Sequence, residues 1–192
     1  AASLRADLCQ IYTDVDGVYT ADPRIVKDAR KLDEVTYNEM LELATLGAQV
    51  LHNRSVEMAK KYNVKLEVLS SFTGHPGTKV KEVAKRMEKS YISSVAKNVN
   101  IARIALIGVP NEIGTSFKVF SLLAQNHINV DIILQGIGHE EGKDICFTVA
   151  QSDLEAASVL LKEHQESIGF GHLETNSHIA KVSVVGAGMI NH

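Results

Sequence analysis

Short apolar runs in the N-terminal third of the chain predict strands. Residues 8–13 (LCQIYT) end in TDVDG, so acidic side chains follow the carboxyl end of a strand that runs into a tight turn. Val64, Leu66 and Val68 alternate with polar residues, and this period of two indicates a strand with one buried face. Residues 21–35 contain a turn-forming Asp-Pro dipeptide and show no clear period, so we expect a loop there.

Two helices are predicted between these strands. Thr36 precedes Glu39 by three residues in front of an apolar segment, so the two side chains can cap each other's backbone N–H groups. We expect this first helix to cover residues 37 to about 51. A second, shorter helix is expected over 54–63, closed by Asn63.

The pattern becomes regular in the second half of the chain and follows the order βαββαβ. Strands are expected over 101–108, 128–135, 143–150 and 168–175, helices over 112–127 and 152–165, and a hairpin over 136–143. The first of these helices should bury Phe117, Phe120 and Leu123, and Ser152 should open the second. This order builds a four-stranded antiparallel sheet with two helices on one face.

A segment rich in turn formers, SSFTGHPGT (70–78), marks a boundary between two units, and the charged residues 80–91 after it predict a helical connector. One internal repeat is present, because residues 102–110 (ARIALIGVP) recur as 180–188 (AKVSVVGAG). A second copy of the module therefore starts near the C-terminus. We expect both ends of the chain to continue in a longer protein.

Composition excludes several classes of function. A net charge of −3 from 20 basic and 23 acidic residues gives no footprint for nucleic acid or an anionic membrane. Cys9 and Cys146 are far apart in apolar surroundings, which indicates buried thiols in a reducing compartment. No run of eighteen apolar residues occurs, and the eight histidines form no ligand pattern for zinc. We expect a cytoplasmic protein without a metal site.

Two long stretches carry a resemblance to a known family. TDVDGVYTADPR, the segment LDEVTYNEMLELATLGAQVLHNRSVEMAKKYNVKLEV and the SSF…GT ending resemble the C-terminal third of the aspartate kinase catalytic domain. GVPNEIG, HINVDIILQG, KDICFTVA and AKVSVVGAGM look like the paired ACT domains of the same family, in the same order.

The resemblance implies an α/β chain made of a C-terminal fragment of an amino-acid-kinase domain, a ferredoxin-like ACT domain and the first strand of a second ACT domain. The implied boundaries are 1–75 for the kinase segment, 76–95 for a linker, 96–176 for the first ACT domain and 177–192 for the start of the second. ACT sheets of this family pair side by side, so a homodimer through the ACT domains is expected.

By this resemblance the parent protein transfers the γ-phosphoryl group of ATP, with Mg²⁺, to aspartate, under feedback by lysine, threonine or both. The positions that match the family's nucleotide-binding stretch are Thr13, Asp14, Tyr19, Thr20, Ala21, Asp22, Pro23 and Arg24. A hydroxyl and a carboxylate can bind ribose and adenine, and the planar fork of Arg24 suits phosphate oxygens. Taken without the resemblance, Asp14, Asp16 and Gly17 form an ordinary turn, and Arg24 is a surface charge.

The matching effector positions surround the turn before the first ACT helix, where a helix N-terminus offers N–H groups to a carboxylate. They are Asn111, Glu112, Ile113, Gly114, Thr115, Ser116, Asn129, Val130, Asp131 and Gln135. Asp131 can meet the effector's ammonium group and Gln135 its side chain. The simpler alternative makes Gly114 a turn residue and Asp131 a solvent-facing acid. The family commonly has Asp and Pro where this chain has Asn111 and Ile113, so effector binding is expected to be weakened or altered.

Activity of the chain alone is not expected. Phosphoryl transfer needs positive charge and glycine-rich turns around the phosphates, and this chain has no KxGG-like segment and no GxxxxGK. No residue is therefore assigned as catalytic, and a separate catalytic chain is a candidate partner. The alternatives are a separate amino-acid-binding ACT module that acts on another protein, and a small active kinase.

Overall fold

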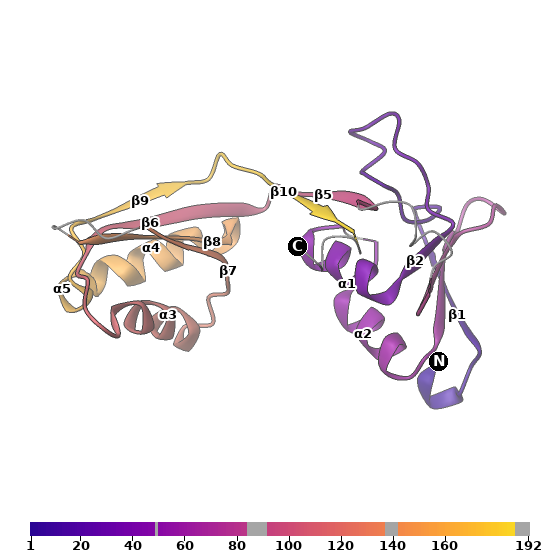
Figure 1. Cartoon of the computed structure of the whole chain (residues 1–192), viewed down its shortest axis with the longest axis horizontal. Coiled ribbons are helices and arrows are strands. Elements are labelled where there is room, and N and C mark those ends of the chain that lie inside the picture. Colours follow the sequence, from indigo (N-terminus) through magenta and orange to yellow (C-terminus); the bar gives the residue numbers. More distant parts are fainter. Residues whose placement is uncertain (49, 84–91, 137–141, 187–192) are drawn as a thin grey trace. The chain divides into compact units, whose positions relative to one another are not determined.

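The computed structural model describes residues 1–48, 50–83, 92–136 and 142–186. These residues form two compact units, one made of Ala1–Asn98 together with the segment that begins at Val182, and the other of Val99–Lys181. The second unit is thus inserted into the chain of the first. Figure 1 shows the elements of both.

The first unit is a four-stranded sheet with two α-helices. Its sequence of elements is η1 (Ala2–Leu4), β1 (Leu8–Thr13), β2 (Glu34–Thr36), α1 (Tyr37–Leu46), α2 (Asn53–Lys61), β3 (Lys65–Ser70), β4 (Thr78–Lys81) and β5 (Ser94–Asn98). The sheet has the order β1-β3-β4-β2. β1 runs parallel to β3 and β4 parallel to β2, whereas β3 and β4 are antiparallel.

Helix α1 begins as the sequence predicts. The Glu39 N–H donates to Thr36 Oγ1 at 3.2 Å, and the Thr36 N–H donates back to the Glu39 carboxylate at 3.1 Å, so the capping box is confirmed. The helix ends at Leu46 instead of near residue 51, because Gly47 adopts a left-handed conformation (φ 113°). Tyr37, Met40 and Leu43 of α1 pack into the core of this unit.

Two expectations about the following chain are corrected. The charged segment predicted to be a helical connector starts as a strand, β4, because Val80 alternates with lysines and pairs with Leu66 of β3. The rest of that segment, 84–91, lies outside the described residues. Glu67, expected on the polar face of β3, is buried, and it accepts a hydrogen bond from Gln10 Nε2 at 2.9 Å.

The second unit has the predicted βαββαβ order. It consists of β6 (Ile101–Val109), α3 (Thr115–Gln125), β7 (Val130–Gln135), β8 (Lys143–Ala150), η2 (Gln151–Asp153), α4 (Leu154–Glu163), α5 (Gln165–Ile168) and β9 (His172–Asn176). Its sheet has the order β7-β8-β6-β9, with antiparallel neighbours throughout. Figure 1 shows α3 and α4 on one face of this sheet. The predicted ferredoxin-like fold is confirmed.

Some side chains of the second unit lie elsewhere than predicted. Phe117 is 76% exposed, and the stripe of α3 that faces the core contains Val119 and Leu123. Ser152 belongs to η2, and the N-cap of α4 is Asp153 without a side-chain cap. Most of the predicted hairpin, residues 137–141, lies outside the described residues.

The segment that repeats the start of β6 forms a strand, β10 (Lys181–Val185). It pairs with β5 in a two-stranded sheet of the first unit, where the Ser93 N–H donates to the Val185 carbonyl at 2.8 Å. Val185 and Ala96 enter the core beneath α1. The chain on either side of the inserted unit is therefore joined by a strand pair.

Candidate functional site

The first candidate site begins at the carboxyl ends of β1 and β3. These parallel strands end side by side at Thr13 and Ser70, and the Ser71 N–H donates to the Thr13 carbonyl at 2.8 Å. Crevices at the carboxyl ends of parallel strands are the usual place for ligands in α/β folds. Thr13 Oγ1 donates to the Asp14 carboxylate at 2.9 Å, so these two predicted site residues lie together.

The loop between β1 and β2 is held closed by backbone pairing. The Leu32 N–H donates to the Val18 carbonyl at 2.8 Å, and the Thr20 N–H donates to the Arg30 carbonyl at 2.9 Å. An isolated antiparallel β-bridge also joins Tyr19 to Lys31. The predicted residues from Tyr19 to Arg24 therefore lie on an ordered loop that follows the end of β1.

Arg24 and Asp22, both predicted nucleotide contacts, bind each other. Arg24 Nε lies 3.0 Å from Asp22 Oδ1, and Nη2 lies 2.9 Å from Oδ2, which is a two-point pairing on an 88% exposed Arg24 side chain. The hydrogen bond from this guanidinium lowers the pKa of Asp22. A phosphate that used the Arg24 fork would have to take the place of this carboxylate.

The sequence did not indicate that Asp16 and Lys31 belong to this candidate site. The Asp16 carboxylate accepts from the Tyr19 hydroxyl at 2.9 Å and from Lys31 Nζ at 3.4 Å. Lys31 also donates to the Pro76 carbonyl at 2.9 Å, so it ties the β1–β2 loop to the loop before β4. No signal in the sequence pairs Lys31 with Asp16, since they are separated by a loop without periodicity.

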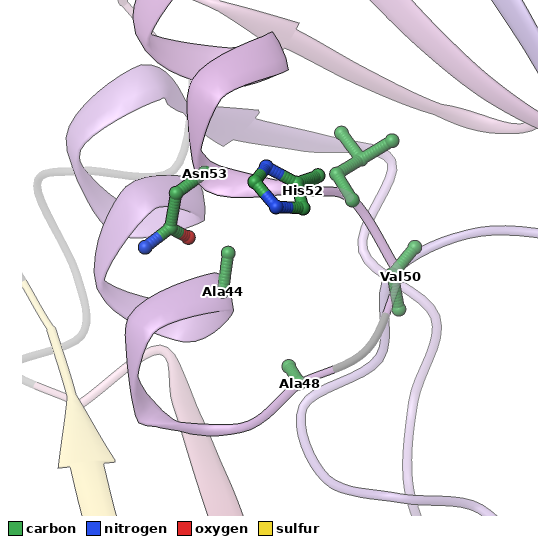
Figure 2. A pocket seen from close by; sticks show the side chains of 6 residues that line it. Ala44, Ala48, Val50, His52 and Asn53 are labelled. Atoms are coloured by element: carbon green, nitrogen blue, oxygen red, sulfur yellow. The ribbon is translucent and has the colours of Figure 1, made fainter. Parts of the chain in front are cut away.

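A cavity of about 410 Å³ lies between the end of α1 and the start of α2, and Figure 2 shows the side chains that line it. Ala44, Ala48, Val50 and Leu51 supply apolar wall, and His52 and Asn53 supply polar groups. Asn53 donates through Nδ2 to Thr45 Oγ1 at 2.9 Å, while its buried Oδ1 has no partner in the described part of the chain. An amide oxygen in this position can accept a hydrogen bond from a bound molecule.

The second candidate site follows the turn before α3. Gly114 has φ 94° as the N-cap of α3, and Thr115 Oγ1 donates to the Glu112 carbonyl at 3.1 Å. Gln135 Nε2 donates to Ser116 Oγ at 2.8 Å, so the end of β7 meets the start of α3. Ile113 is fully exposed and Asn111 belongs to the same exposed turn.

The other three predicted effector residues lie at the opposite end of β7. Asn129 and Val130 line a cavity of about 470 Å³ with Ala124 of α3 and with His127, which follows that helix. Strands rise about 3.3 Å per residue, so Asn129 and Gln135 are separated by about 20 Å. Within one chain the structure therefore brings the turn residues and Gln135 together, and Asn129–Asp131 lie apart from them.

Asp131 has a partner in the same unit. Lys181 Nζ forms an ion pair with Asp131 Oδ2, and the Lys181 side chain is 9% exposed whereas that of Asp131 is 50% exposed. Sequence reasoning gave no reason to connect these residues, because they are fifty positions apart.

Groups of three or more His, Cys, Asp or Glu side chains that could hold a metal ion are absent from the described residues. Among these same residues, none of the helices has the length and apolarity needed to cross a membrane.

Comparisons with known proteins agree with the division into two units. Residues 1–70 match the amino acid kinase family, and residues 104–165 match an ACT domain family. The aspartate kinase of Pseudomonas putida is 46% identical over 193 residues, which cover 100% of this chain and 47% of that relative. The chain thus spans about half the length of the curated relatives that it matches.

Solved structures give the same result. E. coli aspartokinase III in complex with lysine and aspartate is 28% identical, with a TM-score of 0.75 and coverage of 96% of this chain and 41% of that one. The same enzyme in complex with aspartate and ADP is 28% identical, with a TM-score of 0.78 and the same coverage.

The chain therefore combines a segment of the amino acid kinase family with an ACT domain. The similarity over the whole chain narrows this assignment, and the chain belongs to the aspartate kinase family.

Proposed function

We propose that this chain is the amino-acid-sensing part of an aspartate kinase whose intact form phosphorylates aspartate with ATP and Mg²⁺. The observation that carries the proposal is the similarity to aspartate kinases over the entire chain, across both the kinase segment and the ACT domain. Lysine, threonine or both are the proposed effectors. A complex of E. coli aspartokinase III with lysine and aspartate supports an effector of this class.

The nucleotide contacts proposed within this chain are the β1 end and the loop after it: Thr13, Asp14, Tyr19, Thr20, Ala21, Asp22, Pro23 and Arg24. Their place at the carboxyl ends of parallel strands supports this assignment. A complex of E. coli aspartokinase III with ADP is in keeping with it. Phosphate-cradling elements would come from another part of the parent protein, so the chain by itself is proposed to be inactive.

The effector site is proposed to be completed by a second copy of the chain. β7 is an edge strand, and Ile132, Ile133 and Leu134 on it are exposed apolar residues. Antiparallel pairing of two β7 edges would place Asn129–Asp131 of one chain beside Gln135 and the Gly114 turn of the other. A homodimer through the ACT sheets would thus complete two equivalent effector sites, each made of one half from either chain.

Calorimetric titration with lysine and threonine, separately and together, tests the effector site. We expect saturable binding of at least one amino acid, and we expect Asp131→Ala to abolish it. Asp153→Ala, which removes an acid at the N-cap of α4, is the matched control and should leave binding unchanged. Binding that survives Asp131→Ala at full affinity would exclude this site. A coupled ADP-release assay with aspartate should show no turnover above the blank, and turnover would identify a self-sufficient kinase.

A further inference from the structure

The ion pair between Lys181 and Asp131 occupies part of the proposed effector site. Lys181 is the last residue of the second unit, and its side chain is 9% exposed although it ends in an ammonium group. A largely buried ammonium group is stable only beside an opposite charge. In the described part of the chain, Asp131 is the carboxylate that it contacts.

The chemistry of this contact is that of the proposed ligand. The free amino acid presents an ammonium group, and Asp131 is the residue proposed to bind it. Lys181 already presents an ammonium group to Oδ2 of the same carboxylate. One carboxylate that is half exposed cannot give its full interaction to two cations at once, so the two ammonium groups compete.

We propose that Lys181 is a built-in competitor for Asp131 and the residue that determines the affinity of the effector site. The proposal rests on the effector site proposed above. The amino acid binds only when Lys181 leaves Asp131, so the apparent affinity is reduced by the fraction of molecules in which Asp131 is free. Lys181 thereby raises the concentration of amino acid at which the chain responds.

Removal of the competitor tests the proposal. Lys181→Met keeps an unbranched apolar stem in the buried position and removes the charge, and it leaves Asp131 half exposed to water. We expect the amino acid to bind Lys181→Met about tenfold more tightly than the wild type. This gain corresponds to an ion pair that is formed in about nine-tenths of the wild-type molecules, because only the remaining tenth can bind the amino acid. Lys162→Met, which removes an exposed lysine near the end of α4, is the matched control and should bind like the wild type.

A double-mutant cycle separates competition from a general structural effect. In an Asp131→Asn background the amide oxygen still accepts a hydrogen bond from the effector but carries no charge, so the weaker binding that remains should not be strengthened by Lys181→Met. Circular dichroism checks that each variant is folded. Lys181→Gln, which is polar and uncharged, serves as the second variant if Lys181→Met does not fold, and the same gain is expected from it.

The outcomes are distinguishable. If the wild type binds the amino acid and Lys181→Met or Lys181→Gln binds it equally or more weakly, the role of Lys181 is refuted. The effector site itself is then still supported. A gain of the same size in the Asp131→Asn background overturns the role of Lys181 too, because the gain then does not pass through Asp131. Absence of binding in the wild type and in every variant overturns the effector site and, with it, the competitor.

Discussion

Thr78 is a single buried residue whose hydroxyl joins three segments of the first unit. Its Oγ1 accepts from the Val18 N–H at 2.8 Å and donates to the Leu32 carbonyl at 2.5 Å, so β4 holds both ends of the β1–β2 loop. A Cβ atom added to Gly17 would lie 2.5 Å from this oxygen. The loop that carries the proposed nucleotide contacts is thus fixed by a residue outside it.

Thr78→Val should destabilise the first unit by about 1–3 kcal/mol, because the side chain keeps its shape and leaves the buried Val18 N–H without an acceptor. Urea denaturation followed by circular dichroism measures this. Thr73→Val, a change in the exposed loop before β4, is the control and should have a much smaller effect. Equal effects of the two substitutions would show that the Thr78 hydroxyl has no special role.

Asp16 gives the first unit a pH dependence at the acid end. Partial burial raises the pKa of Asp16, but the hydrogen bonds from Tyr19 and Lys31 outweigh it and hold the pKa below its ordinary value of 3.8. A carboxyl whose pKa is lower in the folded state stabilises the fold above its unfolded pKa. That contribution is lost as the pH falls through the lowered folded value.

Tyr19→Phe should therefore bring the pKa of Asp16 back toward 3.8 and make the loss of stability on acidification smaller. A carbon-detected NMR titration of Asp16, with unfolding measured at neutral and acid pH, tests both parts. Tyr12→Phe is the control, since Tyr12 is 61% exposed. An unchanged Asp16 titration in Tyr19→Phe would refute the role of the tyrosine hydroxyl.

At the scale of elements, the start of α1 is the best-specified feature of the sequence. Thr36→Ala removes the capping hydroxyl and should cost about 1 kcal/mol of stability, within the range measured for other N-caps. Chemical denaturation of Thr36→Ala and Thr36→Ser isolates the cap, because serine keeps the hydroxyl and removes only the methyl group. Equal stability of the two variants would contradict the capping role.

Local signals in the sequence predicted the types of the elements. They failed where the structure of a segment depends on the element that it packs against or pairs with. Thr36 and Glu39 were found because the cap is local, and the strands of the second unit because their apolar runs are bounded by turns. Leu123 is buried as predicted, but Phe117 was misplaced because a helix with apolar residues on more than one side does not show which stripe faces the sheet, and Val119 is buried there instead. β4 was missed because a short charged strand is stabilised by its pairing with β3 and β2.

The candidate sites show the same limit. Spacing and resemblance selected Thr13, Asp14 and the Gly114 turn, which lie at a strand end and a helix start as expected. They could not show that Asp22 already fills the Arg24 fork, or that Lys181 already binds Asp131. Such pairings depend on where side chains meet in space. They are also the features that decide how readily a ligand can enter.

At the scale of the whole molecule, the insertion of one unit into the chain of the other predicts two separate unfolding events. Among the described residues, the buried core of the second unit lies between 102 and 170, and the buried core of the first unit contains none of these residues. Leu123→Ala leaves a cavity in the second core, and Met40→Ala leaves one in the first, with an expected cost of about 2–5 kcal/mol each.

Because the two units share no core residue among those that the structure describes, each substitution should destabilise one unit alone. Hydrogen exchange followed by mass spectrometry reports on both units in the intact chain. Leu123→Ala should accelerate exchange in β6, α3 and β8 and leave α1 and β3 unchanged, and Met40→Ala should do the reverse. Acceleration throughout the chain by either substitution would mean that the β5–β10 strand pair couples the two units into one cooperative structure. In that case an event at Asp131 could reach the β1–β2 loop through β10 and β5, since the Val95 N–H donates to the Thr20 carbonyl at 2.8 Å.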